Sequence, residues 1–277
     1  APPVVTEVAR RTGVDVVAAD LPSTEILSGV SNSRIGMYQR YGGGNMEEGW
    51  TRLVFEQFDF PYSSVMDAEI QAGDLNASYD VLVFPDDSWA AITGLPGTDG
   101  GGRGGGRGGN TPPDYRSGIG TEGVQAIRDF VENGGTVVAM GGATDFAIRA
   151  LDLGVRNALT GLDSMEFFCP GSTLHVDVDA TNPLAWGMPK DALALFWGSP
   201  AFEITASDAY NYDRVVTYAE RNILQSGWLV GEKHLSKRAA VITARVGEGK
   251  VALLGIRAQH RAQTHGTYKL LFNALIN

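Results

Sequence analysis

The sequence TVVAMGGATD, residues 136–145, joins an apolar run to two glycines and then to small and polar residues. A nearly continuous apolar run is typical of a strand that is buried on both faces. The two glycines tolerate the backbone angles of a sharp turn. Phe146, Ile148 and Leu151 follow in a stretch that favours a helix. The stretch therefore predicts a buried strand, a tight turn and a helix.

The same strand–loop–helix unit is found nearer the N-terminus. Arg34–Gln39 and Tyr79–Phe84 are apolar runs of strand length. After the first run come three glycines and then Asn45, a residue type that favours the N-cap of a helix. Glu48 stands three positions later, where an acidic residue completes a capping box. We therefore expect a helix to begin at Asn45.

The C-terminal part supplies another strand of the same kind. Ala239–Val246 and Val251–Ile256 flank a Gly-Glu-Gly turn and predict a hairpin, and Tyr268, Leu271 and Leu275 mark a last helix. Apolar strands that alternate with helices are typical of a parallel sheet covered on both sides. We predict an α/β fold with helices on both faces of a mostly parallel sheet, whose strands include Arg34–Gln39, Tyr79–Phe84, Thr136–Met140 and Val251–Ile256.

Three segments depart from this pattern. Residues 1–33 are weakly patterned and are expected to be an N-terminal segment or linker, in which residues 14–19 could form a short strand. Residues 99–110 read DGGGRGGGRGGN, which favours a flexible surface loop over an RNA-binding segment because it carries only two arginines. Residues 165–238 form a β-rich insertion within the α/β domain at 34–277, with short strands expected at His175–Asp179, Leu193–Trp197 and Arg214–Tyr218.

The composition excludes several classes of function. The chain has 277 residues, of which 43% are hydrophobic, and a net charge of 22 − 32 = −10. Such an acidic chain without a basic patch is a poor partner for nucleic acid. No apolar run reaches the roughly 18–20 residues that cross a bilayer. The chain begins Ala-Pro-Pro without a visible signal peptide, and we expect it to be a processed product or part of a longer precursor.

The candidate site lies where the parallel strands end. Ligands of open parallel sheets bind beyond the carboxyl ends of the strands. Four segments are expected to meet there, namely residues 42–48, 85–88, 141–145 and 257–265. From them we select as a candidate pocket Asn45, Glu48, Asp86, Arg257, His260 and His265.

The turn after Met140 resembles the nucleophile elbow of hydrolases and amidotransferases, which carries Ser or Cys at its tip. Here Gly141, Gly142 and Ala143 carry no nucleophilic atom, and Thr144 is more typical of a residue that caps the first helical turn. We expect an elbow without catalytic residues. The spacing of His, Cys and acidic residues matches no metal site, so neither a metal nor another cofactor is expected.

Longer motifs suggest a family. The chain from about Arg34 onward resembles the C-terminal domain that follows the catalytic domain in some bacterial M14 zinc carboxypeptidases, on the stretches NMEEGWTR (45–52), PPDY (112–115), GIG (118–120), FCPGS (168–172), SGWL (226–229) and QTHGT (263–267). The resemblance implies a flavodoxin-like sheet of the class I glutamine amidotransferase type. It also implies a secreted or periplasmic protein, although the chain itself shows no targeting signal.

The family's chemistry does not carry over to these residues. No histidine of the chain begins a His-x-x-Glu zinc motif, and no cysteine stands at the elbow. The first hypothesis is therefore a non-catalytic accessory or interaction domain, whose partner is the carboxypeptidase domain of the same precursor or a second copy. Two alternatives remain open. One is a hydrolase that uses Glu48, Thr144 and His265, and the other is a self-assembling structural protein.

Overall fold

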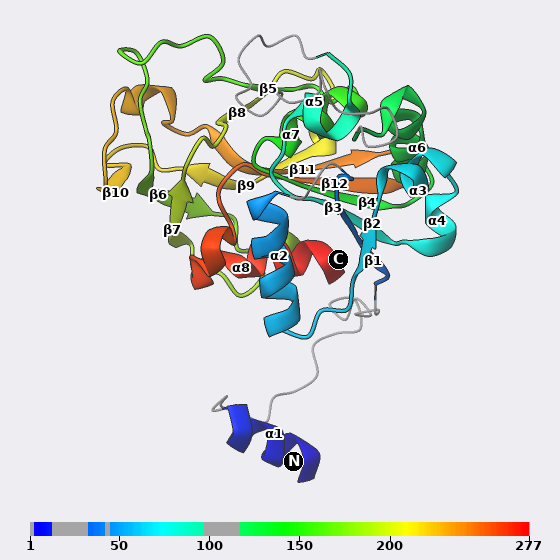
Figure 1. Cartoon of the computed structure of the whole chain (residues 1–277). Helices are drawn as coiled ribbons and strands as arrows, with labels where there is room; N and C mark the ends of the chain where they lie inside the picture. Colours follow the sequence, from blue (N-terminus) through cyan, green and yellow to red (C-terminus); the bar gives the residue numbers. More distant parts are fainter. Residues whose placement is uncertain (1–2, 13–32, 42–44, 97–116, 277) are drawn as a thin grey trace. The chain divides into compact units, whose positions relative to one another are not determined.

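The computed structural model describes residues 3–12, 33–41, 45–96 and 117–276 (Figure 1). The chain divides into two compact units, Ala1–Ser31 and Asn32–Asn277. In the first unit, helix α1 spans Pro3–Thr12, which the weak patterning of this segment did not predict. The expected strand at 14–19 and the Gly-rich loop at 99–110 lie outside the described residues.

The second unit is built on one sheet. In the described part of the chain the sheet has 12 strands. They are β1 (Ile35–Tyr38), β2 (Ser63–Val65), β3 (Val81–Phe84), β4 (Thr136–Met140), β5 (Val155–Asn157), β6 (Ser172–Val178), β7 (Asp191–Phe196), β8 (Phe202–Ile204), β9 (Tyr212–Tyr218), β10 (Leu224–Ser226), β11 (Ala239–Val246) and β12 (Gly249–Leu254).

The core of this sheet is parallel, in the order β2-β1-β3-β4-β12. This is the order of flavodoxin-like folds. The register sets Val138 of β4 beside Val83 of β3 and Ala252 of β12. Four predicted strands therefore lie in one sheet, and the predicted α/β fold is confirmed. The five strands end at a common edge, which positions the loops discussed below.

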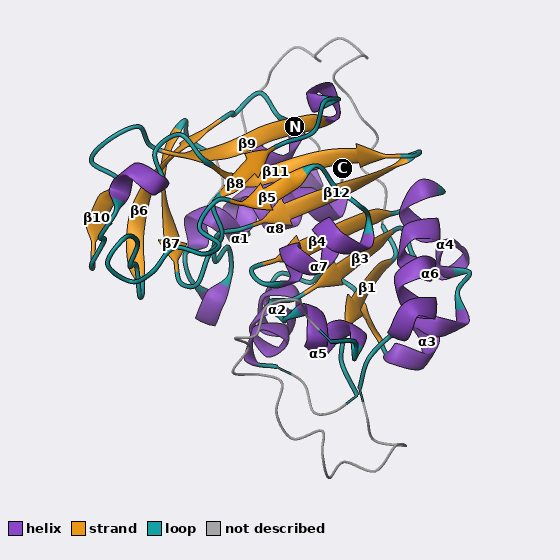
Figure 2. Cartoon of the chain, turned by 90° about the horizontal axis from the view of Figure 1, so that it is seen from above, coloured by secondary structure: helices purple, strands orange, loops and turns teal. Residues whose placement is uncertain are grey.

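The remaining strands make the complete sheet a mixed one. β11 pairs antiparallel with β12, as the hairpin prediction requires, and β9, β6 and β10 continue outward from it in antiparallel order. Figure 2 shows β6, β7 and β10 at the opposite end of the second unit from α3, α4 and α6. The short strands β5, β8 and β10 were not predicted, because three residues carry too little periodicity.

Helices cover both faces of the parallel core. Their bounds are α2 (Met46–Gln57), α3 (Asp67–Ala72), α4 (Leu75–Ser78), α5 (Trp89–Thr93), α6 (Gly120–Glu132), α7 (Ala143–Ala150) and α8 (Tyr268–Ile276). Figure 1 shows α2 and α8 together, and Phe58 after α2 packs on Phe272 of α8 with ring centroids 5.0 Å apart. Within the described ranges, no helix combines the length and the apolar character needed to cross a bilayer.

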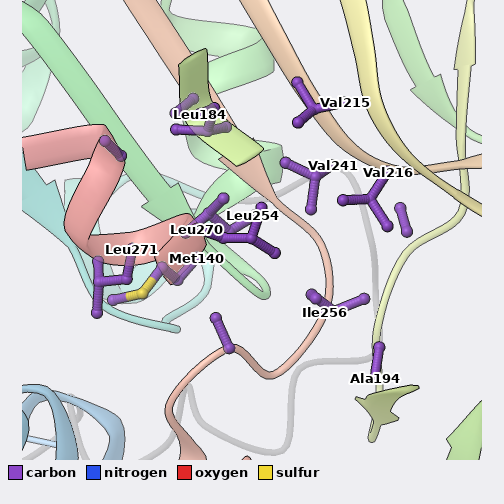
Figure 3. Close-up of a cluster of buried hydrophobic side chains, with 14 of the residues drawn as sticks. Met140, Leu184, Ala194, Val215, Val216, Val241, Leu254, Ile256, Leu270 and Leu271 are labelled. Atoms are coloured by element: carbon purple, nitrogen blue, oxygen red, sulfur yellow. The ribbon is translucent and has the colours of Figure 1, made fainter. Parts of the chain in front are cut away.

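Alternate residues of each core strand point into two separate hydrophobic clusters. Met140 and Leu254 belong to one cluster, together with Leu270 and Leu271 of α8. Figure 3 shows these four side chains gathered between the sheet and α8. Ala139 points the other way, into the cluster that α6 and α7 close with Ile127, Phe130 and Phe146. Burial on both faces is the reason why the core strands are apolar throughout.

Candidate functional site

A sharp elbow joins β4 to α7. Gly141 directly follows the strand with a left-handed φ of +53°, and its N–H donates to the carbonyl of Leu254 on the neighbouring strand over 3.0 Å. Thr144 closes the turn, since its Oγ1 donates to the carbonyl of Gly141 over 2.6 Å. Position 141 therefore has the left-handed backbone conformation at the tip of the turn, where an elbow nucleophile would stand.

The carboxylate of Asp86 fills the elbow. Asp86 follows β3, and its Oδ1 accepts a hydrogen bond from the backbone N–H of Gly142. A Cβ atom placed on Gly141 would lie 2.6 Å from both Cγ and Oδ1 of Asp86. A Cβ on Gly142 would lie 2.9 Å from Oδ1. The space that a nucleophilic side chain needs is thus taken by an acidic side chain of the same molecule.

Arg257 holds Asp86 in this position. The guanidinium Nη1 forms an ion pair with Oδ2 of Asp86 and lies 3.8 Å from Oε1 of Glu47. Its Nε donates to the backbone carbonyl of Trp197 over 2.7 Å. The side chains of Arg257 and Asp86 are only 13% and 20% exposed. Limited access to water makes the loss of either partner costly, because the other charge would be left poorly solvated and unpaired.

His260 and Glu47 form a second buried pair in the same cluster. Nδ1 of His260 donates to Oε1 of Glu47. The imidazole is 9% exposed, and its Nε2 is buried without a hydrogen-bond partner in the described residues. The indole of Trp197 meets the imidazole edge-on, with ring centroids 4.9 Å apart. A histidine whose Nδ1 is held by a carboxylate has its tautomer and orientation fixed, which leaves Nε2 for other chemistry.

Asn45 belongs to a neighbouring network around Asp87, the residue next to Asp86. Its Nδ2 donates to Oδ2 of Asp87 over 3.0 Å, while its Oδ1 accepts from the backbone N–H of Glu48 over 2.6 Å and caps α2. Arg40, after β1, forms an ion pair with Asp87 at 3.2 Å. These contacts bring the ends of β1 and β3 together at the point where the strand order reverses, which is the usual ligand site of such sheets.

Other candidate residues from the sequence are engaged elsewhere. The Glu48 carboxylate forms an ion pair with Arg52, one turn along α2. His265 is exposed and packs on the ring of Tyr268 at a centroid distance of 5.2 Å. The Thr144 hydroxyl is used in the elbow, as described above. The structure thus brings Asp86, Arg257 and His260 into one cluster with Glu47 and Trp197. It places Asn45 in a neighbouring network with Asp87 and Arg40. The sequence analysis did not select Glu47, Asp87, Arg40 or Trp197.

Other reactive groups lie outside the cluster. Cys169 is 8% exposed, and burial raises the pKa of its thiol, so the nucleophilic thiolate is disfavoured. Burial and the hydrogen bond to Asp67 raise the pKa of Tyr38, whose hydroxyl donates to Oδ1 of Asp67 over 2.7 Å. Within the described residues, no group of three or more His, Cys, Asp and Glu side chains is arranged to hold a metal ion.

Comparison with solved structures places this geometry in a known fold. A protein described as ThuA-like from Bacteroides uniformis aligns with a TM-score of 0.51 and 13% identity, over 94% of each chain. A cytoplasmic protein from Salmonella typhimurium gives 0.52 and 13%, over 88% of this chain and 97% of its own. A protein described as a component of GMP synthase from Thermoplasma acidophilum gives 0.51 and 7%, over 88% and 92%.

The chain has the class I glutamine amidotransferase-like fold. At these identities the likeness extends to the fold alone. No protein-family model matches the chain, and no curated protein matches it. The amidotransferase-like elbow is therefore described from the residues of this chain, where Gly141 occupies its strained position and Asp86 its interior.

Proposed function

We propose that this chain is a non-catalytic accessory domain with an amidotransferase-like fold, which binds a ligand or partner and performs no acyl transfer. One observation carries the proposal. The elbow has no side chain at Gly141, and the Asp86 carboxylate lies where such a side chain would go. A tetrahedral intermediate of acyl transfer also needs free backbone N–H groups. The N–H of Gly142 is already committed to Asp86.

The charges at the elbow support the same conclusion. An oxyanion hole stabilises negative charge that develops in the transition state. Here the carboxylate of Asp86 lies in its place and pairs with Arg257. An incoming oxyanion would meet like charge at short distance, which disfavours it further.

The finer part of the proposal rests on the sequence motifs named above. Because these motifs resemble the C-terminal domain of M14 zinc carboxypeptidases, we propose that the chain comes from a secreted or periplasmic protein that also contains an M14 catalytic domain. In this proposal the chain binds that catalytic domain or its substrates. The coding sequence around this segment tests the idea. An in-frame catalytic domain with a His-x-x-Glu zinc motif supports the proposal, whereas a complete coding sequence without one contradicts it.

We expect the purified chain to stay unlabelled by serine- and cysteine-directed activity probes and to release no ammonia from glutamine above background. The physical reason is the absence of an accessible nucleophile at the elbow. Labelling is measured by intact-protein mass spectrometry after incubation at neutral pH. A Cys169→Ala variant serves as the control, because it removes slow, unspecific labelling of the buried thiol.

The variant Thr144→Ser tests the remaining hydroxyl of the elbow. It keeps the hydrogen bond to Gly141 and should behave as the parent chain does. Stoichiometric labelling that survives Cys169→Ala but disappears in Thr144→Ala would show a working nucleophile and would refute the non-catalytic proposal.

A further inference from the structure

We infer that the cluster at the carboxyl edge binds a small, neutral, ring-shaped ligand with adjacent hydroxyl groups, that is, a cyclic polyol. The inference rests on the proposed function, since it names the ligand class for the same edge of the sheet. Its starting point is Nε2 of His260, a buried polar atom without a hydrogen-bond partner in the described residues. Such an atom is costly to leave unsatisfied and points to a missing partner.

The cluster offers both donors and acceptors. With Nδ1–H given to Glu47, Nε2 of His260 is left to form a hydrogen bond of its own. Within the ranges that the structure describes, Oε2 of Glu47 accepts no hydrogen bond and Nη2 of Arg257 donates none. A ligand that matches these three atoms must both donate, to Oε2 of Glu47, and accept, from Nη2 of Arg257. Hydroxyl groups do both.

The charge of the cluster argues against an ionic ligand. Arg257 lies between two carboxylates, those of Asp86 and Glu47, so its positive charge is already neutralised. An anion would meet these acids without a spare cation, and the elbow N–H that attracts anions is taken by Asp86. A cation could pair with the second carboxylate, but it could not accept a hydrogen bond from Nη2 of Arg257. A neutral ligand avoids the cost of burying a further charge beside these groups.

Trp197 supplies the apolar side of the site. Its side chain is 48% exposed although it packs against the buried imidazole of His260. A ring with hydroxyl groups on its edge and C–H groups on its faces can lie on the indole while its edge faces the polar cluster. Because Trp197 also covers the imidazole, we expect its side chain to shift when the ligand reaches Nε2.

The test uses the full chain, isotopically labelled, and follows the ring nitrogens of histidine and the indole N–H of tryptophan by NMR. The probe is a mixture of myo-inositol, D-glucose, D-galactose and D-mannose at millimolar concentration, and sodium acetate is the anionic comparison. The polyols should shift the signals of His260 and Trp197, and acetate should leave them unchanged. His260→Gln and Glu47→Gln should each weaken the binding at least about tenfold.

Two neighbouring residues give matched controls. His265→Gln and Glu48→Gln remove the same groups from positions outside the cluster, and each should keep the affinity within about twofold. All variants are first compared by urea unfolding, and if His260→Gln does not fold, Glu47→Gln decides the test. Shifts with acetate but not with the polyols, no shift with either, or an equal loss in the control variants would overturn the inference. Probe labelling at the elbow would instead refute the proposed function, so the two failures are distinguishable.

Discussion

Replacing Asp86 with alanine is expected to lower the free energy of unfolding by about 3 kcal/mol. Asp86 accepts the hydrogen bond of Gly142 and forms an ion pair with Arg257. The substitution removes both interactions at once. The Arg257 side chain is 13% exposed, so water compensates it poorly, and Glu47 lies 3.8 Å away from it. The loss is measured as the change in the urea-unfolding free energy.

A control pair is found at the start of the helix that follows the elbow. Asp145 and Arg149 form an ion pair at 3.4 Å whose side chains are 51% and 27% exposed. Asp145→Ala should therefore cost less than about 1 kcal/mol. If Asp86→Ala were as mild as Asp145→Ala, the contacts of Asp86 with Gly142 and Arg257 would not stabilise the elbow as described. The double variant with Arg257→Met should recover part of the stability, because it removes the unpaired charge.

Much of the fold was predictable because its core strands are buried on both faces. Runs such as Thr136–Met140 and Val81–Phe84 are apolar without alternation, and their short length, their valines and the glycine or proline that follows favour a buried strand over a buried helix segment. The elbow was predictable for a related reason. A strand that leads directly into a helix needs a sharp turn, and the glycines at 141 and 142 mark its place. The predicted parallel sheet and its edge follow from these local signals.

The composition of the site was less predictable, because it depends on which side of a helix packs inward. Glu47 and Glu48 are neighbours near the start of α2, but successive helical residues point about 100° apart. Glu47 faces the imidazole of His260, whereas Glu48 pairs with Arg52 along the helix. The capping-box pattern drew attention to Glu48. Only the packing of α2 against the loop after β12 shows that Glu47 belongs to the cluster.

The same limit applies to the histidines and to Asp86. His260 and His265 lie in one loop, and no local pattern separates the buried one from the exposed one. Asp86 was selected for its position after β3, but its entry into the elbow depends on a contact with Gly142, 56 residues away. Contacts between the ends of different strands leave no periodic trace in the sequence.

Gly141→Ala should reduce the free energy of unfolding by about 3 kcal/mol. Two costs add up. An alanine at a left-handed φ of +53° costs about 1 kcal/mol relative to glycine, and overpacking in a filled site costs about 1–3 kcal/mol more. The new Cβ would lie 2.6 Å from the Asp86 carboxyl group and 2.9 Å from its Cβ. Gly161, with a φ of +86° and no atom within 4 Å of an added Cβ, isolates the backbone cost, so Gly161→Ala should cost about 1 kcal/mol.

A double-mutant cycle separates the two costs at the elbow itself. In an Asp86→Gly background the carboxyl group and its Cβ are gone, so Gly141→Ala should cost only about 1 kcal/mol there. The coupling of about 2 kcal/mol between the two positions measures how fully Asp86 occupies the space for a nucleophile. Equal costs of Gly141→Ala in both backgrounds would mean that the elbow has room for a side chain after all. The steric argument for a non-catalytic elbow would then fail, because a nucleophile could be accommodated at position 141 beside Asp86.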